Sequence, residues 1–244
     1  MIKFFQKKKD KSIDLIISPT ILQDNKEEFV KDIIEPCLKS QPEWWKALKI
    51  DMMKNIGQEK KLNVKTCPAF IELFKNSYIV KSPCDWLFDA KPGEYWRFHT
   101  SNEKLAAAED HDFDLQMNSF SNGSIYNFKL KLPMTMKSAK GSGQINLVYM
   151  QPYYHNYNFP LTIMPGIIPL IEDTHVNLNI NYAYENAKHI KFMCKKGDVL
   201  AYLYCTEKKL PPFNITQSDS YGHWTWFINK FRGSYLNKLN ENYK

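Results

Sequence analysis

The hydrophobic positions of this chain follow two different periods, and the change falls near residue 66. Before it, apolar side chains recur at helical spacing in residues 24–34, a segment that Pro36 ends. A second short helix is predicted to start after Pro42, in PEWWKALKIDMMKNIG, and to end at Gly57. We therefore expect residues 1–66 to form a helical and irregular N-terminal segment.

Beyond residue 66, short runs of β-branched and aromatic residues alternate with Pro, Gly, Asn and Ser. In VNLNINYAY, Val176, Leu178 and Ile180 face one side and the asparagines between them face the other, as in a half-buried strand. The predicted strands are residues 78–80, 86–88, 95–100, 124–132, 144–150, 161–168, 176–182, 189–194 and 199–205. Many short strands with no long helices between them predict an antiparallel β-sandwich or jelly roll rather than a doubly wound α/β fold.

The last segment returns to a helical period. In HWTWFINKFRGSYLNKLN the large apolar residues recur every three or four positions, which predicts an amphipathic C-terminal helix that packs on the outside of the sheet. We expect one domain, in which residues 67–212 form the β-sandwich and residues 213–244 hold the helix that packs on it.

Charge is distributed unevenly along the 244 residues. Residues 1–66 carry a net charge of +4 (14 basic, 10 acidic), residues 67–185 carry −3 (9 and 12), and residues 186–244 carry +6 (10 and 4). Only Arg97 and Arg232 are arginines, and base readout favours bidentate arginine, so we expect no sequence-specific contact with nucleic acid.

No stretch approaches 18 consecutive apolar residues, and the N-terminus lacks the apolar core of a secretory signal, so neither a membrane span nor secretion is expected. The five cysteines are an odd number without CxxC spacing. They predict reduced thiols in a cytoplasm, most of them small core residues.

One alternative to a binding protein is an enzyme with a metal site. The segment EDHDFD, residues 109–114, lacks the glycine and the final glutamate of a calcium loop, so it is expected to be an exposed acidic loop. Jelly-roll iron enzymes use two histidines and a carboxylate, and here they would be His111, Asp112 or Asp114, and His175. That set would define an iron- and 2-oxoacid-dependent oxygenase. We expect instead that His111 and His175 lie apart and that the protein binds no cofactor.

Nucleophilic catalysis has little support in the sequence. Cys84, followed by Asp85, is a candidate nucleophile if a histidine lies near it in the fold, but a buried structural cysteine is the preferred interpretation. GxSxG, P-loop and GxGxxG motifs are absent from the sequence, and GSG at 141–143 is typical of a turn. In KKGDVL, Gly197 is expected to adopt a positive φ and Asp198 to bond the turn backbone.

The segment QPYYHNYNFP stands out because it concentrates aromatic residues in a predicted loop. Its candidate binding residues are Tyr153, Tyr154, His155, Tyr157 and Phe159. A loop with so many aromatic side chains either folds over the mouth of the sandwich or contacts a partner. The sequence therefore predicts a protein partner or self-association.

Three stretches carry a resemblance to a known family. They are PEWWKAL with KTCPAFIELFKNSYIVKSPCDWLF, then TMKSAKGSGQINLVYMQP, then GIIPLIEDTHVNLNINYAY with IKFMCKKGDVLAYLYC. In this order they resemble an uncharacterised family of hypothetical proteins from T4-like marine phages, related to a bacterial domain of unknown function, over residues 40–206. Relatives have an acidic residue after the threonine of the third stretch, whereas here His175 follows Thr174.

The resemblance implies a phage source and a fold style, but it brings no established activity. The leading hypothesis is a non-catalytic β-sandwich protein that acts by binding, as a virion component, an assembly factor or a host-directed accessory. Its expected location is the host cytoplasm or the virion.

Overall fold

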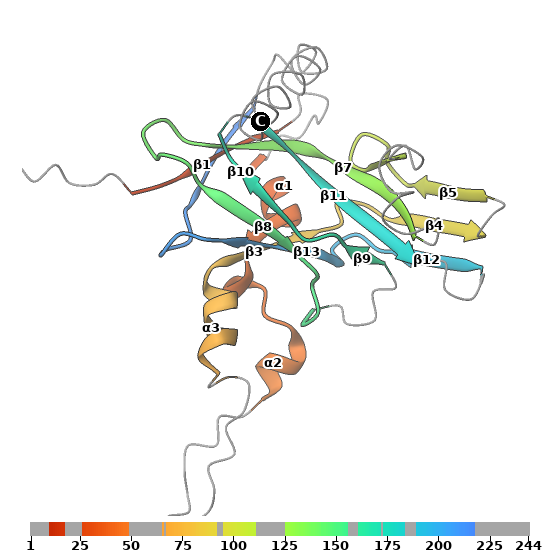
Figure 1. The fold of residues 1–244 in the computed structure, drawn as a ribbon, viewed down its shortest axis with the longest axis horizontal. Helices are drawn as coiled ribbons and strands as arrows, with labels where there is room; N and C mark the ends of the chain where they lie inside the picture. The colour runs from red at the N-terminus through yellow and green to blue at the C-terminus, as the bar shows by residue number, and fades with distance from the viewer. Residues whose placement is uncertain are drawn as a thin grey trace, which may run out of the picture.

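A computed structural model of the chain describes residues 10–17, 26–48, 65, 67–91, 95–110, 125–155, 161–171, 173–183 and 189–217. Within these ranges the protein is mainly β, with strands in three sheets and a few short helices. Figure 1 shows the strands stacked in layers, with helices α2 and α3 standing below them. The predicted C-terminal helix lies outside the described residues.

The first sheet has the order β14-β1-β7-β11-β9, with β6 also paired to β7. These strands are β14 (Phe213–Gln217), β1 (Ile13–Ile17), β7 (Ile125–Ser138), β11 (Thr174–Ala183), β9 (Thr162–Ile163) and β6 (Ala107–Asp110). β1 and β14 come from distant parts of the chain and pair in parallel, whereas the other strand pairs of the described ranges are antiparallel. The antiparallel prediction is therefore correct apart from this one edge, whose long connection permits a parallel pair.

The second sheet has the order β10-β8-β13-β3-β2, and the third has the order β12-β4-β5. The second contains β10 (Gly166–Pro169), β8 (Asn146–Met150), β13 (Val199–Cys205), β3 (Ser77–Lys81) and β2 (Ile34–Pro36). The third contains β12 (Ile190–Cys194), β4 (Trp86–Lys91) and β5 (Tyr95–Thr100). The helices are α1 (Lys26–Ile33), the 3₁₀ turn η1 (Cys37–Lys39), α2 (Glu43–Ala47) and α3 (Pro68–Lys75).

One apolar core joins these sheets. Leu15, Leu130 and Leu178 enter it from the first sheet, while Leu147 and Leu203 enter it from the second, and all five are fully buried. In the third sheet, the paired residues Phe88 of β4 and Phe192 of β12 border the core. Phe88 stacks on Phe128 of β7 in the first sheet, with ring centroids 4.9 Å apart.

The alternation predicted for residues 176–182 is confirmed over residues 176–180. Val176, Leu178 and Ile180 are fully buried in the core, whereas Asn179 is exposed and Asn177 is half-buried. A strand in this register places its aliphatic side chains against the second sheet and its amides on the outer face.

Two predicted strands differ from the observed strands in more than a few terminal residues. The prediction for residues 124–132 stopped before Pro133, but β7 continues to Ser138. β6 pairs with residues 128–131 and β1 with residues 134–138, so Pro133 lies at the junction where neither neighbour needs its missing N–H. The predicted strand 161–168 divides into β9 and β10 in different sheets, with Pro165 between them.

The sequence missed several elements. β1 and β2 lie in the segment expected to be helical and irregular, while β6, β14 and α3 were not predicted. The prediction that residues 109–114 form an exposed loop is wrong for Glu109 and Asp110, because β6 adds them to the side of β7 opposite β11. The predicted first helix is confirmed as α1. The prediction that the second helix runs to Gly57 is wrong, because α2 ends at Ala47, where the next residue, Leu48, has an extended backbone.

Both predicted turns are confirmed. Gly141 and Gly143 have φ values of 86° and 67° in the turn before β8. Gly197 has a φ of 90° between β12 and β13, and the backbone N–H of Lys195 donates to Asp198 Oδ2 at 2.8 Å.

Replacing Gly197 by alanine is expected to lower the free energy of unfolding by about 1–2 kcal/mol, because a β-carbon is strained at positive φ. Gly166→Ala is the matched control, since its φ lies outside the left-handed region and an added Cβ would meet no atom within 4 Å. This variant is expected to be neutral or more stable by up to about 1 kcal/mol. Urea denaturation measures both, and equal losses in the two variants would contradict the prediction.

Candidate binding site on the outer face of the second sheet

A second, smaller apolar cluster lies on the face of the second sheet that points away from the core. Ile79 of β3 and Tyr202 of β13 are paired neighbours there, and Met150 of β8 pairs with Tyr202 from the other side. These side chains alternate with the core residues of the same strands, so the sheet is apolar on both faces. η1, α2 and α3 supply the residues that cover this outer row.

α3 is set by its own sequence, PAFIELFK. Pro68 occupies the first helical position, where its missing N–H costs nothing. Phe70 and Phe74 are four residues apart and therefore share one face, and both are buried. This spacing in the sequence was the signal that could have predicted the helix.

The cluster is built on a stack of aromatic rings. Trp45 of α2 stacks on Phe70 and Phe74 with centroid separations of 4.7 and 5.2 Å, and the two phenylalanines lie 4.7 Å apart. Pairs in this geometry each contribute about 0.5–1.5 kcal/mol beyond burial of their area. The stack therefore forms a rigid base on the sheet.

The aromatic segment after β8 packs on this base. Tyr154 lies edge-on to Phe70 at 4.1 Å, and Trp44 Nε1 donates to the carbonyl oxygen of Tyr154 at 2.6 Å. Gln151 holds the base of the segment, since its side chain donates to Leu161 O and accepts from the N–H of Ile163.

His155 anchors the turn to two distant elements. Its Nε2 lies 2.5 Å from the carbonyl oxygen of Ser40, and its Nδ1 lies 2.7 Å from the hydroxyl of Tyr202. A carbonyl oxygen can only accept, so Nε2 carries the hydrogen and Nδ1 accepts from Tyr202 when the imidazole is neutral. The ring also stacks on Phe74 at 5.9 Å.

The structure describes three of the five candidate binding residues of this segment. His155 is half-buried and faces the sheet, whereas Tyr153 is 65% exposed and Tyr154 is 36% exposed. Tyr157 and Phe159 lie outside the described residues. Together with Trp44, which is 40% exposed, Tyr153 and Tyr154 form what we call the aromatic surface.

The titratable groups of this cluster are held in neutral forms. Burial raises the pKa of the Cys37 thiol to about 12, with a smaller contribution from Glu35. Burial likewise raises the pKa of Tyr202. A thiol with such a pKa stays protonated at neutral pH, so Cys37 is not a thiolate nucleophile.

Burial lowers the pKa of His155 below its ordinary 6.5; Lys81 acts in the same direction, while the Ser40 carbonyl opposes it. Burial also lowers the pKa of His175, together with Lys131 and Lys129. The unfolded chain therefore binds more protons than the folded chain just below pH 6.5, and stability must fall as the pH falls.

We expect the free energy of unfolding to decrease below pH 6.5 by up to about 1.4 kcal/mol per pH unit for each of these two histidines. Urea denaturation at pH 7.5, 6.5 and 5.5 measures the slope. His155→Gln is expected to reduce that slope, because one of the two groups no longer titrates. A slope unchanged by this substitution would show that His155 is not responsible.

The residues of the iron hypothesis are described only in part. His111, Asp112 and Asp114 lie outside the described residues. His175 lies on β11, paired with Thr135 of β7, and has the positive charges of Lys129 and Lys131 close to it. Across the described ranges no group of three or more His, Cys, Asp and Glu side chains is arranged to hold a metal ion.

The cysteines largely follow the prediction. Cys37, Cys84, Cys194 and Cys205 are buried, and Cys67 is exposed. Cys84 Sγ lies 3.2 Å from Thr100 Oγ1 and 3.8 Å from the carbonyl oxygen of Asn102, both neutral groups. The preferred interpretation of Cys84 as a buried residue is confirmed.

Known proteins provide no further identification: no family model, no curated protein and no solved structure matches the chain. No helix in the described part of the chain is long and apolar enough to cross a membrane.

Proposed function

We propose that this protein is a phage-type, non-catalytic β-sandwich protein that acts by binding a protein partner or a second copy of itself. The aromatic surface carries the proposal: Trp44 and Tyr154 remain exposed although they rest on an aromatic stack, and the neighbouring Tyr153 is 65% exposed. Exposed aromatic side chains held in fixed positions are typical anchors of protein interfaces, because little side-chain entropy is lost when they are covered.

The core supports binding over catalysis. An oxygenase on this scaffold would need two histidines and a carboxylate pointing inward between the sheets, whereas the buried side chains of the core, among the residues that the structure describes, are mainly aliphatic and aromatic. The virion, an assembly intermediate and the infected host cytoplasm are the proposed settings, in line with the resemblance to marine phage proteins.

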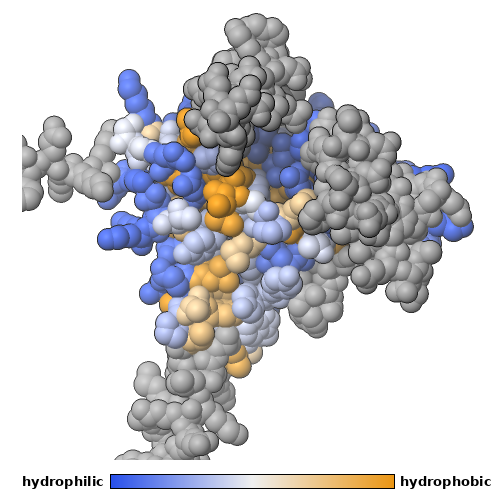
Figure 2. Space-filling model, viewed as in Figure 1, coloured by the Kyte–Doolittle hydropathy of each residue, from blue (hydrophilic) through white to orange (hydrophobic). Residues whose placement is uncertain are grey.

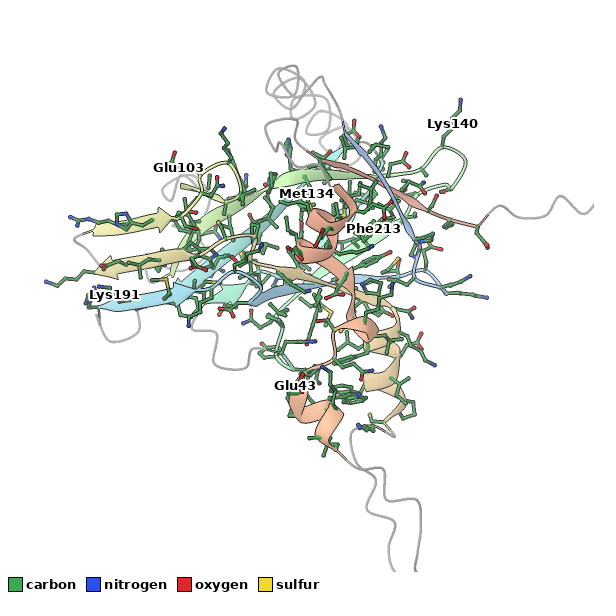
Figure 3. All side chains as sticks on the ribbon, turned by 180° about the vertical axis from the view of Figure 1, so that it is seen from behind. Glu43, Glu103, Met134, Lys140, Lys191 and Phe213 are labelled. Carbon is green, nitrogen blue, oxygen red and sulfur yellow. The ribbon has the colours of Figure 1, made fainter. Side chains whose placement is uncertain are left out.

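A crosslinking experiment tests the proposed surface. A photoreactive phenylalanine analogue at position 153 is expected to give a discrete crosslinked product in the infected or expressing cell. The same analogue at Glu103, an exposed position away from Glu43 of α2, is the control (Figure 3). Trp44→Ala is expected to abolish the product from position 153. Equal products from both positions would contradict the proposal.

Metal analysis addresses the oxygenase alternative. Purified protein is expected to carry no stoichiometric transition metal, and its native mass reports self-association. Iron at one equivalent, lost in His111→Ala and in His175→Ala, would instead support the oxygenase.

A further inference from the structure

The aromatic surface continues into an apolar row on the same face of the second sheet. Ile167 of β10 pairs with Val148 of β8, which pairs with Tyr204 of β13. Val148 and Tyr204 are each two residues from the covered pair Met150 and Tyr202, so this row runs parallel to the one under the helices. We call Ile167, Val148 and Tyr204 the apolar row.

The apolar row is accessible to a partner. Ile167 is 71% exposed, and Val148 and Tyr204 are half-buried. Figure 2 shows a band of apolar residues that runs from the region of β10 and β8 toward α2 and α3. An elongated ligand could therefore cover the row and the aromatic surface together.

The charges beside this band sum to a net positive charge. Lys39 of η1 and Lys75 of α3 are exposed and form no salt bridge within the described residues. Of the two carboxylates in η1, α2 and α3, Glu43 pairs with Lys46 at 2.6 Å, whereas Glu72 accepts from the neutral Asn76 Nδ2 at 2.6 Å and keeps its charge. Lys39 and Lys75 together outweigh the charge of Glu72, so the border of the aromatic surface has a net positive charge.

Lys65 adds to this charge. Its Nζ donates to the carbonyl oxygen of Leu48 at 2.5 Å and lies 5.9 Å from the centroid of the Trp45 ring. An acidic ligand is complementary to such a border.

We infer that the occupant of this face is an acidic protein segment with aromatic or aliphatic anchor residues, and this inference rests on the proposed function. The anchors cover the aromatic surface and the apolar row, and the carboxylates face Lys39 and Lys75. Aliphatic Ile167 and Val148 suit protein side chains better than stacked bases, and the rings of Trp45, Phe70 and Phe74 already stack on one another.

Selection from a random dodecapeptide display library on the purified full chain tests the inference. The enriched peptides are expected to combine Asp or Glu with aromatic or aliphatic residues, and Trp44→Ala with Tyr153→Ala is expected to abolish their binding. Melting curves of this double variant must show that it stays folded at the temperature of the binding measurement, so that lost binding is not caused by unfolding.

Charge reversal provides the second measurement. Lys39→Glu with Lys75→Glu is expected to weaken the best peptide by about 10-fold or more at low salt, and by less as salt is raised. Lys140→Glu with Lys191→Glu is the matched control, because both lysines are exposed and lie well away from Glu43 (Figure 3). This control is expected to change the affinity by less than about 2-fold.

The outcomes separate the two proposals. Enriched peptides that are neutral or basic, and whose binding requires Trp44, would contradict the inference of an acidic partner but would support the aromatic surface as a binding site. Selection that yields no Trp44-dependent peptide would overturn both. A single-stranded oligonucleotide that binds more tightly than the selected peptides, and depends on Trp44 and Lys39, would replace the acidic segment by nucleic acid.

Discussion

Replacing Ile180 by alanine is expected to lower the free energy of unfolding by about 2–5 kcal/mol. Ile180 is fully buried in the core and lies between Phe128 of β7 and Ile163 of β9 in the strand register. The substitution removes apolar contacts and leaves a cavity that close-packed neighbours refill only in part. Chemical denaturation followed by far-UV circular dichroism measures the loss.

Asn179→Ala is the control for this prediction. Asn179 is the preceding residue of the same strand and is exposed, so its substitution is expected to change the free energy of unfolding by no more than about 0.5 kcal/mol. The difference between the two variants tests the register directly, because a slip of one residue would exchange their positions. A larger loss in Asn179→Ala than in Ile180→Ala would show that the register is wrong.

The sheet could be predicted where the pattern is local. Residues 176–182 alternate without a break, and the strand predicted at 95–100 matches β5 in both limits. β1 was missed because IDLII is one short apolar run in a lysine-rich segment, and only its pairing with β7 and β14 makes it a strand. Such non-local pairing leaves no local signal in the sequence.

The residues of the candidate site could likewise be predicted from the sequence only where the signal is local. Tyr153, Tyr154 and His155 were predicted because aromatic side chains in a loop are unusual. The groups that position them were not predicted, since Ser40 lies 115 residues before His155 and Tyr202 lies 47 residues after it. Residues this far apart in the sequence give no local pattern from which their contact in the folded protein could be predicted.

Helix α3 was not predicted because its apolar residues lie close in sequence to those of a predicted strand. Phe70 and Phe74 fall next to the strand predicted at 78–80, and the change of texture after residue 66 suggested that everything beyond it is β. The i and i+4 spacing of two phenylalanines after Pro68 carries the helical period, but only over eight residues. α3 therefore depends on its packing against the outer face of the second sheet.

This dependence makes Phe74 the most sensitive position of the site. Phe74 is 1% exposed and contacts the rings of Trp45, Phe70, His155 and Tyr202. Phe74→Ala is expected to cost about 3–5 kcal/mol, because the ring is removed from the centre of the stack. Hydrogen exchange should show the amides of α3 losing protection before those of the core strands, since the helix has few other contacts to hold it.

Trp44→Ala separates stability from binding in the same layer. Trp44 is 40% exposed, and its ring lies at the edge of the stack, with centroids 5.9–6.5 Å from those of Trp45, Phe70 and Tyr154. Its removal is expected to cost about 1 kcal/mol, near the centre of the range for single substitutions, and to leave α3 protected. It should nevertheless abolish the crosslink from position 153. If Trp44→Ala instead destabilised the protein as much as Phe74→Ala, the exposed indole would be part of the structural stack rather than of a binding surface.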